Sequence, residues 1–503
     1  MGEKSDRRHR ATPAASGAAP SAARHGLRGT VLWLAPALLT LVVTSVGLDH
    51  AQLWRDELAT WSAATRSVRD LVRLAGTIDA ATGPYYLFMH GWTALAGDST
   101  IALRLPSVLS MTGAAALTAL LGRRLAGARA GLLAGLLFAL LPGTSRYAQE
   151  ARPYALATLL AVLATLLLVD ALRRPGWWRW IGYAAALAAL GLTHLIALTL
   201  LAAHAVAVLA ADRVGLTDDG GGGRNRRRWF WVPAVLPAVL LVAPLALVAR
   251  SQRGRQLQWV DIVRPSDLTT LPGGLAQSSV VGGLLVGLAA LGAARLGRRA
   301  LLPGAAVLLP VLLLFVAGSA VPIWVPRYLV FVVPFACLLA GAALAAVPLP
   351  GGLAVVVLAG LLGGPDQAAL RRTHEWPRSA PIDYRAVAEV IAAGQRPGDA
   401  IVYSPRRSWL FLDFGIEYQL RDRRPRDALL VEGAARRGDL WATECARPAE
   451  CLAGVPRVWL VLSGRHADPV AAVSGAKGAA LRDGFTVAQV WQRPGLTLAL
   501  LTR

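Results

Sequence analysis

The chain carries a row of long apolar segments, and no other feature restricts its fold as strongly. A helix needs about 20 apolar residues to cross the hydrocarbon core of a bilayer. The candidate spans lie at approximately 30–48, 101–121, 130–144, 154–172, 180–193, 195–211, 231–249, 278–294, 300–320, 327–346 and 352–363. Charged residues make up only 16% of the 503 residues, against about 25% in soluble proteins. The sequence therefore predicts an all-α polytopic membrane domain of about 11 transmembrane helices over residues 30–363, and it excludes a cytosolic enzyme and a disordered chain.

The arginines between the spans predict the orientation of the chain in the cell membrane. If the basic segment 1–29 is cytoplasmic and the first span is an uncleaved anchor, the loops on the cytoplasmic side carry most of the arginine. A cleaved signal peptide is the alternative interpretation of the first span. The opposite loops also contain arginines such as Arg55 and Arg152, which is an exception that needs its own explanation. The net charge of +22 does not indicate a nucleic-acid partner, because the arginines alternate with apolar segments instead of forming one basic face.

From about residue 364 the composition changes to polar residues, turns and short apolar runs. The pattern predicts a helix over 384–393 and strands over 400–403, 458–462 and 497–501, so that residues 364–503 form a small α/β domain. An odd number of spans places this domain outside the cell. Cys445 and Cys451 lie close together in it, and an oxidising compartment favours a disulfide between them, with two free thiols as the alternative.

Residues 49–100 form a first outer loop that is too long for a plain connection. Its apolar positions recur at helical spacing and predict a helix lying flat in the headgroup layer. These positions are Leu58, Trp61, Thr65, Val68, Val72 and Ala75. A second helix is predicted to begin at Gly83-Pro84, where Tyr85, Tyr86 and Trp92 suit a membrane interface.

Asp56 and Glu57 follow the first span directly and are candidates for acid–base chemistry. A carboxylate held at the membrane surface could act as a general base on an acceptor hydroxyl. The alternative is that both are solvated loop acids, or ion partners of Arg55 and Arg66.

Two later places carry candidate ligands for phosphate and sugar. Glu150 lies among Arg146, Arg152, Tyr147 and Tyr154, which predicts either a structural ion pair or a pocket in which arginine binds phosphate. Arg327-Tyr328 begins a span, so Arg327 either extends to the interface or binds a lipid phosphate. His194 is either a packed polar residue or a ligand, and no His/Cys/Asp spacing resembles a zinc site.

Taken in order, these pieces resemble the GT-C glycosyltransferases of family 39, the protein-mannosyltransferase-like group, in its bacterial branch. The resemblance covers roughly residues 30–363, and the tail at 383–402 also resembles tails of bacterial members. The matching pieces are Asp56-Glu57, GPYYLFMHGW at 83–92, LRLPSVL at 103–109, YAQEARPYAL at 147–156, THLIAL at 193–198 and RYLVFVVPF at 327–335.

The resemblance implies a reaction and roles for these residues. A sugar, mannose or another pentose or hexose, would pass from a polyprenyl-phosphate donor to an acceptor hydroxyl at the outer membrane face, with inversion. Asp56 would be the general base, and Glu57 would orient it or bind the acceptor. The donor phosphate and sugar would be bound by Arg146, Glu150, Arg152, Tyr154, His194, Arg327, Tyr328 and Tyr85. Some relatives use a divalent cation and others do not, and no obligatory cofactor is predicted here.

The sequence also bears on the identity of the acceptor and on functions other than that of an enzyme. Eukaryotic protein mannosyltransferases carry a sugar-binding trefoil domain, for which the outer stretch near 250–277 is too short. A lipid, glycan or cell-wall acceptor is therefore at least as well supported as a protein. The alternatives to an enzyme are a transporter or flippase of lipid-linked sugar, and a non-catalytic membrane assembly protein.

Overall fold

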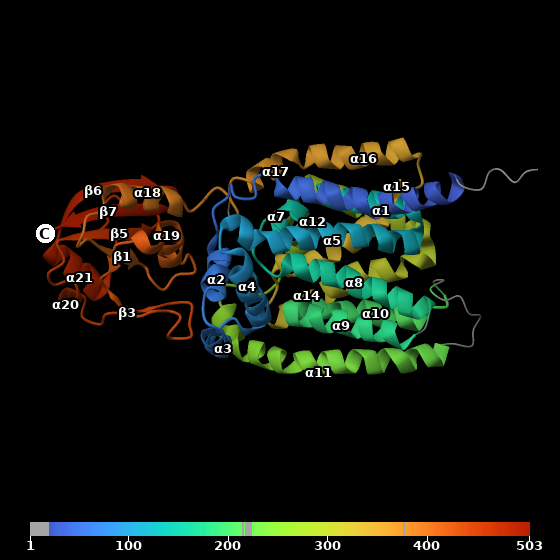
Figure 1. Cartoon of the computed structure of the whole chain (residues 1–503), viewed down its shortest axis with the longest axis horizontal. Helices are drawn as coiled ribbons and strands as arrows, with labels where there is room; N and C mark the ends of the chain where they lie inside the picture. The colour runs from blue at the N-terminus through green and yellow to red at the C-terminus, as the bar shows by residue number, and fades with distance from the viewer. Residues whose placement is uncertain (1–19, 175, 214–215, 217–223, 376–377) are drawn as a thin grey trace, which may run out of the picture.

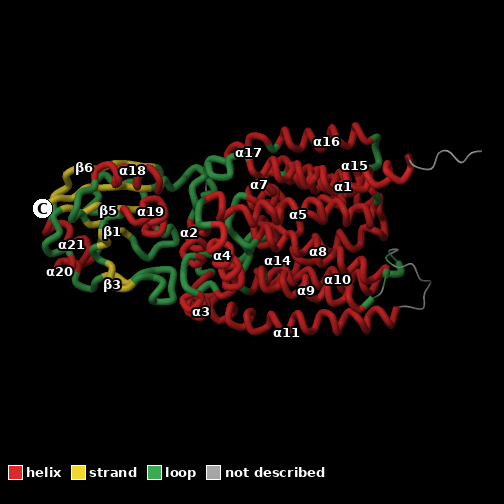
Figure 2. Tube along the Cα trace, in the orientation of Figure 1, coloured by secondary structure: helices red, strands yellow, loops and turns green. Residues whose placement is uncertain are grey.

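The structure is a computed structural model of the chain that describes residues 20–174, 176–213, 216, 224–375 and 378–503. Most of the predicted cytoplasmic segment 1–29 lies outside the described residues. A long bundle of helices is capped at one end by a domain that contains a β-sheet (Figure 1). Figure 2 shows that the strands are confined to that end.

Apolar helices make up the bundle, as the sequence predicts. Its elements are α1 (Pro20–Ser45), α5 (Thr100–Ala126), α6 (Ala128–Leu140), α7 (Pro142–Ala148), α8 (Tyr154–Arg173), α9 (Trp177–Thr193), η2 (Leu195–Thr199), α10 (Leu200–Ala210), α11 (Arg224–Gln256), α12 (Pro265–Ala276), α13 (Ser279–Leu296), η3 (Gly297–Ala300), α14 (Leu301–Ala320), η4 (Pro326–Val332), α15 (Val333–Leu344), α16 (Leu349–Leu362) and α17 (Gly364–Leu370).

Every predicted span coincides with helix in the structure, so the polytopic fold class is confirmed. In the described residues, 5 helical segments are long and apolar enough to cross a membrane, or up to 7 if each of two bent helix pairs is one span. The apolar helices at Thr30–Ser45 and Leu195–Ala210 are shorter. The predicted number of about 11 spans stays a prediction.

The domain at the end of the bundle has a mixed five-stranded sheet with the strand order β2-β1-β5-β7-β6. Strand β1 pairs in parallel with β2 and β5, whereas β7 pairs antiparallel with β5 and β6. The predicted helix and all three predicted strands are present, whereas strands β2, β3, β4 and β6 were not predicted. The elements are α18 (Tyr384–Gly394), β1 (Ala400–Ser404), α19 (Leu412–Leu420), η5 (Arg421–Arg423), β2 (Arg426–Asp427), β3 (Leu430–Glu432), β4 (Thr443–Glu444), α20 (Pro448–Cys451), β5 (Arg457–Ser463), α21 (Gly475–Gly484), β6 (Thr486–Arg493) and β7 (Leu496–Thr502).

In this domain Cys445 and Cys451 are joined by a disulfide, with an S–S distance of 1.97 Å. Residues 364–370, which open the predicted soluble segment, form α17 beside the bundle, and Gln367 donates a hydrogen bond to Ser145 of α7 at 2.5 Å. The first element of the sheet domain therefore begins at Tyr384.

The helices of the first loop lie between the bundle and the sheet domain (Figure 1). They are α2 (Arg55–Ala64), α3 (Val68–Thr77), η1 (Ala80–Thr82) and α4 (Gly83–Ala96). The predicted start at Gly83-Pro84 is correct, but Tyr85 and Tyr86 are buried and not at a lipid interface.

The predicted single apolar stripe from Leu58 to Ala75 is wrong in its second half. The Ser67 hydroxyl accepts a hydrogen bond from the backbone of Asp70 and starts a new helix, which resets the phase of the pattern. Helix α3 consequently buries Leu71 and Leu74 and exposes Val68 and Val72.

Direct contacts tie the sheet domain to the first-loop helices. The ring of Trp61 on α2 meets the ring of Tyr418 on α19 edge-on at 5.3 Å between centroids. Arg421 donates to the Asp98 carboxylate at 2.5 Å, and Gln52 donates to Asp383 at 2.7 Å. The domain is therefore packed against α2, whose first turn carries Asp56 and Glu57.

Candidate active site

Helix α2 holds Asp56 in its first turn, at the end of the bundle that faces the sheet domain. A carboxylate oxygen of Asp56 lies 3.5 Å from a terminal nitrogen of Arg327, at the start of η4. Both side chains are partly exposed, at 21% and 25% of their surface. The pairing brings the predicted base and a predicted phosphate ligand together from segments far apart in the sequence.

Glu57 is enclosed, although it is the neighbour of Asp56 in the chain. Its carboxylate accepts hydrogen bonds from Arg104 Nε at 2.8 Å, Arg104 Nη2 at 2.7 Å and the backbone N–H of Ala151 at 2.9 Å. Burial alone would raise the Glu57 pKa, but the Arg104 charge and hydrogen bonds, with a smaller contribution from His374, hold that pKa well below its usual range. Glu57 is therefore an ionised anchor of α2 and does not face the open side of Asp56.

Arg104 is a site residue that the sequence analysis quoted in a motif but gave no role. Its Nη1 donates to the carbonyl oxygens of Leu48 and Ala51 at 2.7 and 2.9 Å, and its side chain is completely buried. It thereby connects α5 to the chain that enters α2. An arginine within an apolar helical segment was the signal, because such a charge needs a partner.

Aromatic rings surround Arg327 on several sides. Its Nε donates to the Tyr154 hydroxyl at 3.1 Å. Its guanidinium carbon lies 5.4 Å from the ring centroid of Trp259, 5.8 Å from that of Trp54 and 5.9 Å from that of Tyr328. Contacts of this kind hold a guanidinium in place without neutralising its charge.

A wall of rings continues from Arg327 to His194. The centroids of Tyr154 and Tyr328 are 6.3 Å apart, and His194 lies 5.8 Å from the first and 5.5 Å from the second. The Nδ1 atom of His194 is buried and has no hydrogen-bond partner among the described residues. The wall therefore combines apolar faces with an unsatisfied polar atom, a combination suited to a sugar.

Arg152 approaches the site from the loop between α7 and α8. Its Nη1 donates to the Tyr86 hydroxyl at 3.2 Å and lies 3.5 Å from the Thr60 hydroxyl. Its Nε is buried and makes no hydrogen bond within the described part of the chain. Buried donors are seldom left unpaired, so this atom is available to a polar ligand.

The predicted pair of Arg146 and Glu150 exists. Arg146 Nη1 donates to Glu150 at 2.8 Å, and its guanidinium carbon lies 4.9 Å from the Trp54 ring centroid. Burial raises the pKa of Glu150, the charges of Asp56 and Glu57 add to the shift and the Arg146 charge opposes it, so that the pKa is about 7. Arg146 and Glu150 are both buried, as expected if they form a structural ion pair. One carboxylate oxygen of Glu150 has no hydrogen-bond partner among the described residues.

Tyr85 is buried with a hydroxyl that has no partner among the described residues. His374 and Glu375 were missed by the sequence analysis. They follow α17, and Glu375 lies 3.9 Å from Arg55 while the His374 carbonyl oxygen accepts from Arg146 at 3.1 Å. No local motif marked them, because they reach the site from the end of the bundle domain.

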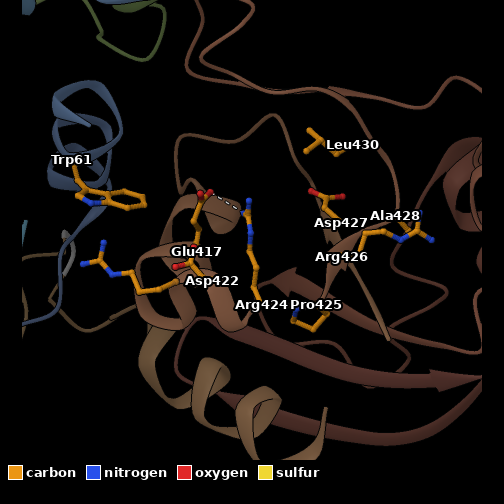
Figure 3. Close-up of a pocket in the computed structure, with 10 residues that line it drawn as sticks. Trp61, Glu417, Asp422, Arg424, Pro425, Arg426, Asp427, Ala428 and Leu430 are labelled. Carbon is orange, nitrogen blue, oxygen red and sulfur yellow. Dashed lines mark hydrogen bonds and ion pairs between the residues drawn. The ribbon is translucent and has the colours of Figure 1, made fainter. Parts of the chain in front are cut away.

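A cavity of about 770 Å³ lies away from Asp56, at the seam between α2 and the sheet domain. Figure 3 shows Trp61 at one edge of the lining residues, with Glu417 joined to Arg424 between Trp61 and Asp427. Arg424 donates to the Glu417 carboxylate at 2.8 Å. Two other charged residues that line the cavity pair with residues outside the lining, Arg421 with Asp98 and Asp427 with Arg406. Among the described residues no group of three or more His, Cys, Asp or Glu side chains could hold a metal ion.

Solved structures share the fold over nearly the whole chain. The crystal structure of ArnT from Cupriavidus metallidurans in the apo state matches with a TM-score of 0.61 and 16% identity, over 96% of this chain and 98% of that one. The same protein bound to undecaprenyl phosphate matches with a TM-score of 0.60 and 16% identity, over 94% and 98%. The chain is therefore a polytopic membrane protein with the GT-C fold, as its resemblance implied.

More distant and more local matches agree with this class. The archaeal oligosaccharyltransferase AglB from Archaeoglobus fulgidus, in complex with an inhibitory peptide and a dolichol-phosphate, matches with a TM-score of 0.50 and 12% identity, over 88% of this chain and 70% of that one. Residues 84–247 match the family described as dolichyl-phosphate-mannose-protein mannosyltransferase. No curated protein matches the chain by sequence.

The buried ion pair generates a prediction about stability. Glu57→Gln leaves the enclosed Arg104 without its counter-charge, so the free energy of unfolding should fall by about 3–5 kcal/mol. The check is denaturant unfolding of detergent-solubilised protein followed by tryptophan fluorescence. Glu450→Gln is the matched control, because Glu450 and Arg447 form an exposed pair and its loss should change nothing measurable. Equal destabilisation by the two variants would show that the enclosed pair is not an anchor.

The raised Glu150 pKa generates a prediction about pH. The unfolded chain releases this proton near 4.5 and the folded protein near 7, so the stability that Glu150 contributes when protonated is lost as pH rises through this window. The apparent melting temperature of the wild type should therefore fall relative to that of Glu150→Gln as pH rises. Glu389→Gln, at an exposed position, should follow the wild type. Parallel curves for the wild type and Glu150→Gln would contradict the shifted pKa.

Proposed function

We propose that the protein is an inverting membrane glycosyltransferase that uses a polyprenyl-phosphate sugar as donor and Asp56 as general base. One observation carries this proposal above the others. The Asp56 carboxylate lies 3.5 Å from the Arg327 guanidinium, so a carboxylate able to take a proton adjoins a cation able to bind phosphate. The unsatisfied Nε of Arg152 adds a second phosphate donor near the same site.

The chemistry is a single displacement at the anomeric carbon. A bond forms between the acceptor oxygen and this carbon while the bond from the carbon to the phosphate oxygen breaks. The acceptor proton passes to Asp56, and the bonding electrons leave with the polyprenyl phosphate. Negative charge develops on the departing phosphate, and Arg327 and Arg152 stabilise it because their positions are set before the reaction. Attack from the side opposite to the leaving group inverts the anomeric centre.

The solved structures that share the fold support this donor class. One of them contains undecaprenyl phosphate and another a dolichol-phosphate. Tyr154, Tyr328 and His194 form the sugar-binding wall in this proposal. Glu57 becomes a positioning residue for α2, and Arg146 with Glu150 supports the site from behind Trp54.

The acceptor is a hydroxyl of a lipid, glycan, cell-wall polymer or protein. No obligatory cofactor is proposed, and a divalent cation remains compatible with the chemistry. A transporter would be expected to place its charged groups near the middle of the membrane. Here Asp56, Glu57, Glu150, Arg152 and Arg327 gather at the sheet-domain end of the bundle, which favours the enzyme.

We also propose that the sheet domain and the active site face the outside of the cell and that the N-terminus is cytoplasmic. Helix α11 ends in Arg253 and Arg255 at the sheet-domain end, but other arginine-rich helix ends lie at the opposite end of the bundle, which is the cytoplasmic side by the positive-inside rule. They include Arg123 and Arg124 at the end of α5 and Arg298 and Arg299 in η3. A disulfide between Cys445 and Cys451 agrees with an oxidising compartment.

The proposed base gives a prediction about turnover. Asp56→Asn keeps the size of the side chain and removes its basicity, so release of polyprenyl phosphate from a polyprenyl-phosphate sugar should slow by roughly 10²–10⁴-fold. Release is measured by mass spectrometry with purified protein and a mixture of donors and acceptors. Asp49→Asn, an exposed acid at the same end of the bundle, should retain full turnover. Undiminished turnover of folded Asp56→Asn would remove Asp56 from the mechanism.

The proposed orientation is checked by cysteine labelling in intact cells. After mild reduction, a membrane-impermeant maleimide should label Cys445 and Cys451 from outside. In a chain that lacks both cysteines, Arg298→Cys should be labelled only after the membrane is permeabilised, because this exposed position lies in η3, at the end of α14 that is far from Arg327. The reverse pattern would place the sheet domain in the cytoplasm.

A further inference from the structure

Asp79 is a buried acid in a backbone conformation that favours asparagine, aspartate and glycine. Its φ angle is 60°, in the left-handed region, and its side chain packs at the turn between α3 and η1. Such a residue persists only when its surroundings determine its position. The contacts of Asp79 therefore indicate its role.

Three donors converge on the Asp79 carboxylate. The Thr82 hydroxyl donates to Oδ1 at 2.8 Å, the Gln256 side-chain amide donates to the same oxygen at 2.5 Å, and the Tyr86 hydroxyl donates to Oδ2. Gln252, one turn earlier on α11, accepts from the backbone of Ala80 at 2.8 Å. Two glutamines of α11 thus clamp the turn that carries Asp79.

The hydroxyl of Tyr86 has one proton, and the direction of its bonds follows from that. Burial and the nearby Asp79 charge raise the Tyr86 pKa well above its usual range, so the phenol stays protonated. The proton is given to Asp79, which leaves the lone pairs of the oxygen for a donor. Arg152 Nη1 is that donor, at 3.2 Å. A charged acceptor polarises the phenol and strengthens the second bond in such a chain.

We propose that Asp79 and Tyr86 are positioning residues that hold Arg152 in the orientation needed to bind the phosphate of the polyprenyl donor. This inference rests on the proposed function. The relay runs from α11 through Asp79 and Tyr86 to one nitrogen of Arg152, and it leaves the buried Nε of Arg152 free for a phosphate oxygen. A guanidinium ordered in advance loses less entropy when phosphate binds.

The test measures binding of undecaprenyl phosphate to the purified full chain in detergent. Tyr86→Phe removes one hydrogen bond to a charged group, so binding should weaken by roughly 10-fold or more. In an Arg152→Ala background the same substitution should have little further effect, because the relay then has nothing to orient. Tyr403→Phe is the matched control, since it removes a buried hydroxyl that has no partner among the described residues, and it should bind as the wild type does.

A second variant keeps the test decisive if Tyr86→Phe fails to fold. Asp79→Asn retains the shape of the side chain and removes its charge, and its effect should likewise vanish without Arg152. The relay would be overturned if Tyr86→Phe or Asp79→Asn weakened binding equally with and without Arg152. It would also be overturned if Arg152→Ala weakened binding and neither of these substitutions did. Failure of the wild type to bind undecaprenyl phosphate would instead count against the proposed donor class, so the two failures are distinguishable.

Discussion

The enclosed ion pair between Glu57 and Arg104 is the interaction on which the rest of the site depends. It connects the first turn of α2 to α5, and Arg104 also holds the two backbone carbonyls that lead into α2. Asp56 precedes Glu57 in that turn, so its direction follows from this anchor. A charge pair removed from water costs much unless it is fully hydrogen-bonded, and here both partners are. The anchor therefore fixes the position of the first turn of α2 relative to α5.

The charged residues of the site fall into two groups. One group is buried and fixes the position of the chain, and the other is partly exposed and can contact a ligand. Glu57 with Arg104 and Glu150 with Arg146 are enclosed, whereas Asp56 and Arg327 are partly exposed and lie farther apart than a close ion pair. Tyr154 and Tyr328 of the aromatic wall contact Arg327, and the relay from Asp79 orders Arg152. A lipid phosphate that enters between the two arginines would meet donors that need little rearrangement, which is the condition for electrostatic catalysis.

The parts of this structure that could be predicted from the sequence are those that depend on local pattern. The apolar segments appear as helices, and the strands at 400–403, 458–462 and 497–501 appear in the sheet because short apolar runs between turns are typical of strands. The phase of α3 was missed because the Ser67 cap breaks the helix between two periodic halves. Strand β6 was missed because its residues alternate weakly and are largely exposed.

The partners within the site could not be predicted, because they come from distant segments. Glu57 and Arg104 are 47 positions apart, and Asp79 and Gln256 are 177 apart. The sequence analysis named Asp56, Arg152 and Arg327 from motif order, and their proximity required the fold. The roles of Arg104, Asp79 and His374 are visible only from their contacts.

The central claim is that Arg152 and Arg327 bind a lipid phosphate beside Asp56. An electron cryomicroscopy structure of the protein in nanodiscs with undecaprenyl phosphate tests it most directly. The account predicts phosphate density within hydrogen-bond distance of both guanidinium groups and close to the Asp56 carboxylate. Phosphate bound elsewhere on the bundle, with Asp56 and Arg327 still paired to each other, would contradict it.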